Sequence, residues 1–397
     1  MTTAQSSTSL RGLRVAVVQP VLPRYRVPFF DLLARRTGIE LTVLCDMHPS
    51  GSLRSDRPTD AFRAEHWPLK SRGPFIDHPA ILEAARSRRF DLAVLGWNMR
   101  MLQLVPALLT GASARRPVLL WGHGFSKSER SLKRSARDAL VRLSSGVIVY
   151  GSQTQRRLLE SGLPPGKVHL AQNAIDQSEI RAATAEWIKG AGMLEDWQRR
   201  QGIVPGELIV FISRMEPDKR ADLLVEAFAR LAPCRPGLKL ALIGGGSCLP
   251  AITSKVNELG IADRVRLTGP LYEERLIAPW CLSAGCFAYP EAIGLSVYHA
   301  FGYGLPVVTS DDLASHNPEV ESIVPGRNGM LYRHRDIVSF ADALNDVLSN
   351  PARREEWRNA ALATVNRAGG FSLETMVSGY AEALAATASR SPRADLL

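Results

Sequence analysis

The chain has 397 residues, of which 45% are hydrophobic and 22% charged. This length predicts two or three domains at about 150 residues each, and the composition excludes a fibrous or wholly disordered protein. Lys and Arg number 49 against 39 Asp and Glu, and the resulting net charge of +10 favours an anionic partner such as a nucleotide diphosphate, an acidic acceptor, an anionic membrane face or nucleic acid.

The chain shows neither a secretory signal nor an apolar stretch of the ~18 residues that a membrane-spanning helix needs. We therefore expect a cytoplasmic protein, with a location at the inner face of the membrane as the alternative. The scattered cysteines favour small buried residues in a reducing compartment over disulfides or a zinc site. They are Cys45, Cys234, Cys248, Cys281 and Cys286.

In the first half of the chain, short apolar runs alternate with segments of helical period. Nearly continuous apolar runs are typical of strands that are covered on both faces, as in a parallel sheet. Strands are predicted at 13–18, 40–45, 91–95, 117–121, 146–150 and 168–172, and helices at 29–36, 79–88 and 127–143. This alternation predicts a doubly wound, Rossmann-like α/β domain over residues 1–205.

A looser region at 173–206 precedes a second series of the same kind. Strands are predicted at 207–213, 238–243, 265–268, 286–289 and 306–309, with helices at 222–231 and 297–301. We expect a second Rossmann-like domain over 206–366, then a helical segment and tail over 367–397, helical from 373 to 386. Two such domains facing across a cleft would bind ligands outside the carboxyl ends of their strands. Residues that directly follow strands are therefore the candidate site residues.

Arg214 follows the strand 207–213, and Lys219 lies just before the next helix. A guanidinium and an ammonium at a strand end near a helix start suit a phosphate, although a solvated turn would also place them there. After the strand 286–289, Glu291 suits sugar hydroxyls, and the backbone N–H groups at Gly294–Ser296 suit a phosphate. The alternative role for Glu291 is a helix-start acid favoured by the helix dipole.

Two loops of the first domain are also candidates. His123 lies between two glycines after the strand 117–121, where it can hydrogen-bond a substrate, act as a general acid or base, or be structural. Arg24, Tyr25 and Arg26 follow the first strand and are expected to contact an anionic or polar acceptor, unless this is only a proline-stiffened surface loop.

The segment 127–143 predicts a basic amphipathic helix, with Leu132, Ala136, Ala139, Leu140 and Leu143 on its apolar face. Packing on the core is the favoured interpretation, and docking on an anionic membrane surface is the alternative. No nucleic-acid-binding module accompanies it, so nucleic acid is not expected as a partner.

Other familiar motifs are missing. Gly244–Gly246 lack the spacing of a dinucleotide fingerprint and predict a tight turn. No catalytic-triad elbow, metalloprotease motif, P-loop or Asp-x-Asp pair occurs, so we expect a metal-free site that uses Arg, Lys and helix dipoles.

Together these loops resemble the family 4 glycosyltransferases of the GT-B fold. Three segments carry the resemblance: SRMEPDKR (213–220), TGPLYEERL (268–276) and PEAIGLSVYHAFGYGLPVVTS (290–310). The first resembles the family's Arg-x4-Lys diphosphate clamp and the last its Glu-x7-Glu element, while WGHG (121–124) resembles its histidine loop.

The resemblance implies transfer of a sugar, with retention, from a nucleotide diphosphate donor of UDP or GDP type to a small-molecule, saccharide or lipid-linked acceptor. No cofactor besides this co-substrate is implied. Arg214 and Lys219 would hold the diphosphate, and Glu291 the sugar hydroxyls. Gly294, Leu295 and Ser296 would offer backbone N–H groups. Leu271 and Tyr272 would lie by the base, and His123 near the sugar.

Two departures from the family pattern stand out. His299 replaces the second Glu of the Glu-x7-Glu element, which in the family accepts hydrogen bonds from the ribose hydroxyls, and a neutral imidazole can accept only one. A Pro23–Arg26 segment stands where the family has a glycine-rich loop. The alternatives are a nucleotide-sugar epimerase or hydrolase of the same fold, or a non-catalytic nucleotide-sugar-binding protein.

Overall fold

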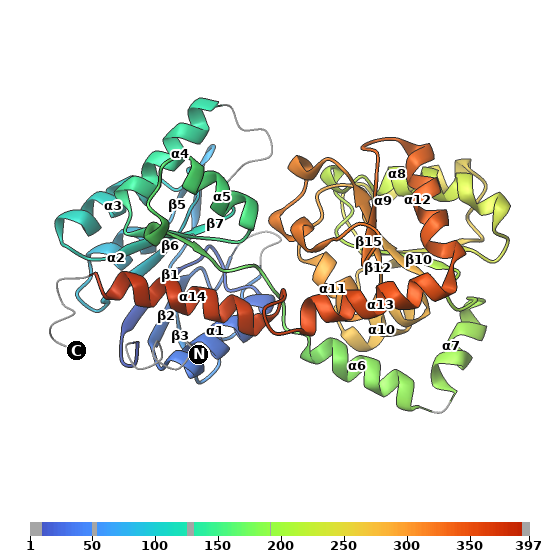
Figure 1. Ribbon diagram of the computed structural model, residues 1–397, viewed down its shortest axis with the longest axis horizontal. Coiled ribbons are helices and arrows are strands. Elements are labelled where there is room, and N and C mark those ends of the chain that lie inside the picture. Colours follow the sequence, from blue (N-terminus) through green and yellow to red (C-terminus); the bar gives the residue numbers. More distant parts are fainter. Residues whose placement is uncertain (1–9, 50–53, 125–130, 191, 391–397) are drawn as a thin grey trace. The chain divides into compact units, whose positions relative to one another are not determined.

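The structure is a computed structural model that describes residues 10–49, 54–124, 131–190 and 192–390. The chain divides into two compact units (Figure 1). The first combines Met1–Asp176 with Leu373–Leu397, and the second is Gln177–Ser372. In each unit the first strand lies within an apolar run of the sequence.

The first unit is built on a sheet of seven strands whose neighbours all pair in parallel. In sheet order these are β3 (Arg63–His66), β2 (Glu40–Cys45), β1 (Arg14–Val18), β6 (Leu92–Gly96), β7 (Val118–Gly122), β8 (Gly146–Val149) and β9 (Val168–Leu170). A separate antiparallel hairpin is formed by β4 (Lys70–Arg72) and β5 (Phe75–Asp77).

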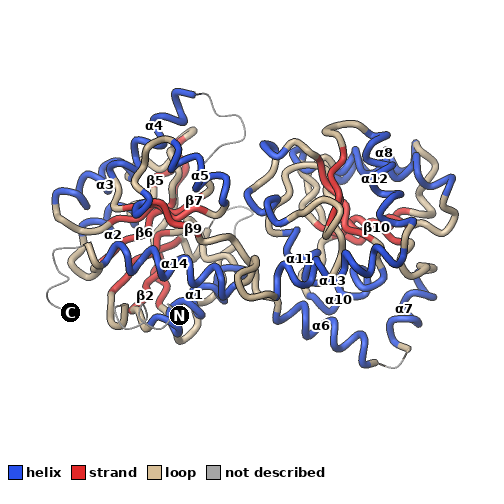
Figure 2. Tube along the Cα trace, viewed as in Figure 1, coloured by secondary structure: helices blue, strands red, loops and turns tan. Residues whose placement is uncertain are grey.

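Helices cover both faces of this sheet (Figure 2). One core contains residues of α1 (Val27–Thr37) and α14 (Leu373–Ala388). The other contains residues of α2 (Ala80–Arg86), α3 (Leu104–Ser113), α4 (Ser131–Leu143) and α5 (Ser152–Glu160). Successive β1 residues point to opposite faces, so Val15 and Val17 join the first core and Ala16 and Val18 the second. Burial on both faces explains the continuous apolar runs.

The last helix, α14, returns to the first unit, beside α1. Its fully buried Tyr380 packs edge-on against Phe29 at 5.2 Å and Trp121 at 5.0 Å between ring centroids. The sequence predicted this helix as part of a separate segment, 367–397. In the structure it completes the first core instead, because its apolar side chains are needed to cover one face of that sheet.

The second unit has a parallel sheet of six strands in the order β12 (Val265–Gly269), β11 (Lys239–Ile243), β10 (Leu208–Ile212), β13 (Cys286–Ala288), β14 (Val307–Ser310) and β15 (Gly329–Tyr332). Its helices are α6 (Ser178–Lys189), α7 (Met193–Gln201), α8 (Ala221–Leu231), α9 (Leu249–Glu258), α10 (Glu274–Ser283), α11 (Ser296–Gly302), α12 (Ile337–Ser349) and α13 (Pro351–Asn366).

Both sheets reverse their strand order once, between β1 and β6 in the first unit and between β10 and β13 in the second. Such a reversal sends the two following loops apart and leaves a crevice at the carboxyl ends of the strands. The predicted fold class, two Rossmann-like doubly wound α/β domains, is confirmed. No helix in the described ranges is both long and apolar enough to cross a membrane.

The looser region predicted at 173–206 is wrong, because α6 and α7 occupy it. Both helices contact α10, and Trp197 packs edge-on against Trp280 with 4.8 Å between centroids. The unit accordingly begins at Gln177, not near residue 205. The glycines and tryptophans of this stretch suggested a linker, whereas the tryptophans in fact anchor the helices to the unit.

The buried face of α4 also differs from the prediction. Ala136, Ala139 and Leu143 are exposed, and Leu140 and Val141 are buried. Beside them Asp138 is buried in a bidentate ion pair with Arg157 of α5, at 2.8 and 3.2 Å. Of the predicted helix 127–143, residues 127–130 lie outside the described ranges, as does the side chain of Leu132.

Candidate active site

The loop after β10 is held close to the loop after β11. The N–H of Met215 donates to the carbonyl of Gly245 at 2.8 Å, and Met215 is fully buried. Gly244 has φ of +142°, and a Cβ there would lie 1.9 Å from the carbonyl oxygen of Ser213. A Cβ at Gly246 would likewise lie 2.6 Å from the carbonyl oxygen of Met215. The three glycines thus allow the two loops to approach closely, in agreement with the predicted tight turn.

Anchoring Met215 leaves its neighbour Arg214 exposed at the carboxyl edge of the sheet. Its guanidinium makes no hydrogen bond or ion pair with any residue that the structure describes. Lys219 ends a short 3-10 turn, Pro217–Lys219, and only 17% of its side chain is exposed. Its Nζ donates to the carbonyl oxygen of Ala292 at 3.1 Å and lies 3.0 Å from Asp218.

The hydrogen bond from Lys219 reaches the loop after β13, across the strand-order reversal. Ala292 has φ of +56°, a left-handed conformation that a residue with a Cβ seldom adopts. The next residue, Ile293, donates its N–H to Nδ1 of the fully buried His316 at 3.1 Å. The loop is therefore fixed from both sides. The backbone N–H groups of Gly294, Leu295 and Ser296 form no hydrogen bond within the described ranges.

Glu291 is buried, with 6% of its surface exposed, among cationic side chains. Its Oε1 accepts a hydrogen bond from Arg335 at 3.0 Å. It also lies 3.9 Å from Arg220 and 3.8 Å from Nε2 of His334. Its Oε2 takes no hydrogen bond from a described residue, so one carboxylate oxygen is committed to the protein and the other is available for a hydroxyl donor.

His299, on α11, pairs with Glu274, the first residue of α10. The imidazole Nε2 lies 2.9 and 3.0 Å from the two carboxylate oxygens, and the Tyr303 hydroxyl donates to Oε2 at 2.7 Å. Burial raises the pKa of Tyr303, so this phenol stays protonated as a donor. The position that carries a carboxylate in the resembled family therefore has a carboxylate beside it, supplied by Glu274.

Leu271 and Tyr272 lie between β12 and α10, in the loop that leads to Glu274. Tyr272 is 78% exposed, and Leu271 is partly buried. Through the Glu274–His299 pair, this loop is connected to α11 and so to the loop after β13.

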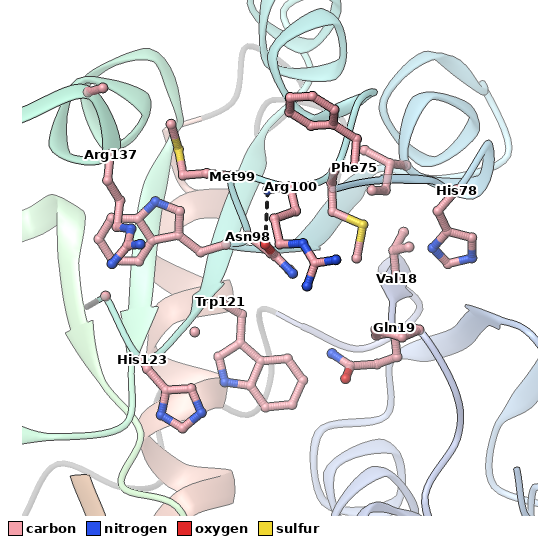
Figure 3. A pocket seen from close by; sticks show the side chains of 18 of the residues that line it. Val18, Gln19, Phe75, His78, Asn98, Met99, Arg100, Trp121, His123 and Arg137 are labelled. Carbon is pink, nitrogen blue, oxygen red and sulfur yellow. Dashed lines mark hydrogen bonds between the residues drawn. The ribbon is translucent and has the colours of Figure 1, made fainter. Parts of the chain in front are cut away.

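The first unit contains a cavity of 890 Å³ at its own strand-order reversal. Gln19 and Pro20 follow β1, Trp97–Met101 follow β6, and Trp121–Gly124 end or follow β7. Figure 3 shows His123 and Trp121 on one side of this cavity and Arg100 reaching into its middle. His123 has an exposed ring that packs on Tyr150, with 4.9 Å between centroids.

The predicted acceptor residues after β1 take different positions. Arg24 and Tyr25 are exposed, whereas Arg26 is buried, with 4% of its surface exposed. The guanidinium of Arg26 lies 4.8 Å from the ring centroid of Trp121 and donates to the Tyr150 hydroxyl at 3.1 Å. None of the three lines the cavity, so the structure does not bring them together with His123 around it.

Sequence reasoning missed Trp97, Asn98 and Arg100, although they follow a predicted strand by the same rule that identified Arg214. Two histidines that the sequence did not single out also reach these sites, since His78 lines the cavity and His334 approaches Glu291. No signal in the sequence indicated Glu274, because its role depends on its contact with His299, 25 residues away in the chain.

Metal ligands and cysteines add little to either site. Among the described residues no three His, Cys, Asp or Glu side chains are grouped so as to hold a metal ion. None of the five cysteines, all of them described, forms a disulfide, and Cys45, Cys281 and Cys286 are buried. Burial raises the pKa of Cys45 and that of Cys286 to about 12, so both stay protonated thiols.

Comparison with known proteins supports the resemblance. Residues 195–364 match the family of group 1 glycosyl transferases. This range includes Arg214, Lys219, Glu291 and His299.

Two curated relatives illustrate the similarity. D-inositol 3-phosphate glycosyltransferase of Nocardia farcinica is 33% identical over 47% of this chain and 42% of its own length. GDP-mannose-dependent alpha-(1-6)-phosphatidylinositol monomannoside mannosyltransferase of Mycolicibacterium smegmatis is 26% identical over 64% of this chain and 66% of its own length. The chain thus matches less than half of the first relative's length and 66% of the second's.

Among solved structures, Alr3699/HepE of Anabaena in complex with UDP superimposes with a TM-score of 0.69 at 16% identity, over 94% of this chain and 99% of that one. Sucrose-phosphate synthase of Thermosynechococcus elongatus gives 0.63 at 17% identity, over 92% and 96%. At these identities the likeness concerns the fold, which is that of the GT-B glycosyltransferases.

Proposed function

We propose that this protein is a retaining glycosyltransferase that moves a hexosyl group from a nucleotide diphosphate sugar to an acceptor hydroxyl without a metal ion. The observation that carries the proposal is the hydrogen bond from Lys219 to the carbonyl of Ala292. It connects the two loops that follow β10 and β13, and so holds Arg214, Lys219 and Glu291 at one edge of one sheet.

The chemistry of the donor explains why cations are needed at this edge. When the bond between sugar and diphosphate breaks, negative charge grows on the diphosphate and positive charge on the sugar ring. Donors that are held in place before the reaction stabilise the growing negative charge without the cost of reorganisation. Lys219 is such a donor, because burial and its hydrogen bond fix its position. Arg214 supplies a guanidinium with no competing partner among the described residues.

The loop after β13 would hold the sugar and its phosphate. The Oε2 of Glu291 is available to accept from a sugar hydroxyl, while Oε1 accepts a hydrogen bond from Arg335. The backbone N–H groups of Gly294, Leu295 and Ser296 would face the phosphate. Leu271, Tyr272 and His299 would contact the nucleoside. The names of the similar proteins, one GDP-mannose-dependent and one in complex with UDP, support a donor of either type.

The acceptor would bind in the first unit, where the cavity at the carboxyl edge includes His123. A small molecule, a saccharide or a lipid-linked saccharide would be accepted there. Arg24 and Tyr25 are exposed for contact with a large acceptor. Arg26, which is buried against Trp121, would attract the acceptor through its positive charge. The basic amphipathic helix predicted at 127–143 would provide a peripheral contact with an anionic membrane when the acceptor is lipid-linked.

The test is product analysis with UDP- and GDP-sugars, each with and without a panel of acceptors, in the presence and absence of a chelator. Transfer that requires an acceptor, retains the anomeric configuration and survives chelation is expected. A changed sugar or free sugar formed equally without acceptor would indicate an epimerase or a hydrolase instead. Binding of donor with no turnover in a sensitive assay would indicate a binding protein, and loss of transfer restored by Mg²⁺ would contradict a metal-free site.

A further inference from the structure

The cavity of the first unit presents a guanidinium that the protein does not neutralise. Arg100 is oriented by two hydrogen bonds, from its backbone N–H to Oδ1 of Asn98 at 3.0 Å and from its Nε to the carbonyl of Pro74 at 2.7 Å. Its two terminal nitrogens form no hydrogen bond or ion pair with any residue in the described ranges. Figure 3 shows this guanidinium pointing into the middle of the cavity.

A second cation lies beneath the wall of the same cavity. Arg26 is buried against Trp121 and Tyr150, both of which line the cavity. Its guanidinium contacts aromatic rings, the Tyr150 hydroxyl and the sulfur of Met376, the last at 3.5 Å. Within the described part of the chain it has no carboxylate partner. A buried cation without a counter-charge is costly, and a bound anion nearby lowers that cost.

The remaining described lining contains arginine but no carboxylate. The described residues that line the cavity include no Asp or Glu, but they include a further arginine, Arg137. The indole N–H groups of Trp97 and Trp121, which also line it, are buried and donate to no described residue. Neutral acceptors such as the side-chain amide of Gln19 also line the cavity, so a neutral sugar would be hydrogen-bonded here, but it would leave the charge of Arg100 uncompensated. A phosphate or carboxylate only accepts and therefore matches this lining.

We propose that the acceptor of this enzyme carries an oxyanion, a phosphate ester or a carboxylate, that binds Arg100 in the cavity between the loops after β1 and β6. This inference rests on the proposed function, since it concerns the acceptor of the same reaction. The apolar side chains of Phe75, Met99 and Trp121 in the lining would pack against the carbon skeleton that bears the anion.

The binding test uses the full chain carrying Arg214→Ala, so that the expected diphosphate site in the second unit does not bind the probes. Calorimetric titrations compare inorganic phosphate, glucose 6-phosphate, glucuronate and glucose. At least one of the three anionic probes is expected to bind more tightly than glucose. Adding Arg100→Ala should weaken that binding by about 10- to 100-fold, because a charge-assisted hydrogen bond is lost.

The matched control is Arg88→Ala, since Arg88 is exposed and precedes β6, at the opposite edge of the sheet. It should leave binding unchanged. Equal binding of charged and neutral probes, or anion binding that survives Arg100→Ala, would overturn the inference. The relative affinities of glucose 6-phosphate and glucuronate distinguish a phosphate site from a carboxylate site.

An activity assay separates this inference from the proposed function. With the chain carrying native Arg214, transfer to anionic acceptors should fall on Arg100→Ala and should stay unchanged on Arg88→Ala. Efficient transfer to neutral acceptors that is unchanged by Arg100→Ala would contradict the anionic acceptor but not the glycosyltransferase activity. Anion binding through Arg100 without any sugar transfer would contradict the proposed function but not the anion site.

Discussion

Lys219 donates a hydrogen bond to the carbonyl oxygen of Ala292 over 3.1 Å, although 73 residues separate them in the chain. The bond spans the point where the strand order of the second sheet reverses, between β10 and β13. It therefore fixes an ammonium group at the place where a doubly wound sheet binds its ligand.

We first predict that Lys219→Ala and Arg214→Ala each lower the rate of sugar transfer by about 10²–10³-fold, the effect of removing one preorganised donor to a developing negative charge. The exposed Arg214 side chain makes no hydrogen bond or ion pair with a described residue, so its removal should not change the melting temperature. Arg327→Ala is the control, because Arg327 is exposed and precedes β15, at the opposite edge of the sheet. Full activity of Arg214→Ala on the true substrates would refute the clamp.

The second prediction concerns the available oxygen of Glu291. Glu291→Gln keeps the shape but loses the charge-assisted hydrogen bond to a sugar hydroxyl. The kcat/KM for the nucleotide sugar should fall by about 10- to 100-fold, while the Kd for the nucleotide diphosphate alone should stay the same. Glu258→Gln, at the exposed end of α9, serves as the comparison. An equal loss of affinity for the nucleotide diphosphate would assign Glu291 to a different contact.

A third prediction follows from the pairing of His299 with Glu274. His299→Glu places two carboxylates side by side and should destabilise the protein by about 2 kcal/mol, because one of them must stay protonated or unpaired. Adding Glu274→Gln should restore most of this loss and should give a nucleotide affinity at least equal to that of the wild type. Urea unfolding and nucleotide titration of the two single variants and the double variant measure both effects. Simple additivity of the two changes would show that the residues do not interact.

The fourth prediction tests the return of α14 to the first unit. The Tyr380 hydroxyl is buried and bonded to no described residue, and the ring packs on Phe29 and Trp121. Tyr380→Phe should therefore raise stability by up to about 1 kcal/mol, because it removes an unsatisfied polar group. Tyr380→Ala should lower stability by about 3–5 kcal/mol, the usual cost of deleting a buried aromatic ring. A loss of stability in Tyr380→Phe would mean that the hydroxyl has a hydrogen-bond partner.

The fifth prediction concerns acid sensitivity. Burial lowers the pKa of His78 in the folded protein below its ordinary value of 6.5, although Asp46 and Asp77 act in the opposite direction. Below pH 6.5 the unfolded chain then binds a proton that the folded chain does not, so stability falls as the pH drops from 6.5 towards the folded pKa. The slope contributed by His78 is at most about 1.4 kcal/mol per pH unit.

His78→Gln should remove this contribution when the free energy of urea unfolding is compared between about pH 8 and about pH 5. His48→Gln is the control, since His48 is exposed. An unchanged slope in the His78 variant would show that this histidine is already protonated in the folded protein at the lower pH.

Much of the fold could be predicted because the strands are buried on both faces. The runs at 40–45 and 238–243 coincide with β2 and β11 to within one residue. The helices α6 and α7 could not be recognised in the same way. Their Trp187 and Trp197 look like isolated aromatic residues until α10 is packed against them.

The candidate site could likewise be predicted only in part. The positions of Arg214, Lys219 and Glu291 at strand ends follow from the sequence, because the residues after all parallel strands of a sheet lie at the same edge of that sheet. That these ends belong to neighbouring strands depends on the strand order, which no local pattern encodes. The burial of Arg26 against Met376, 350 residues away, is equally invisible in the sequence.

By itself, therefore, the sequence determined the strands that are buried on both faces and the edge of the sheet at which each ends, since burial on two faces and strand polarity are local properties. The more exposed strands β3, β4, β5 and β15 were not predicted. Only the tertiary structure decided which of those residues meet. The contacts of Lys219 with Ala292, of His299 with Glu274 and of α14 with the first sheet depend on distant segments packing to exclude water, and that packing is a property of the whole unit.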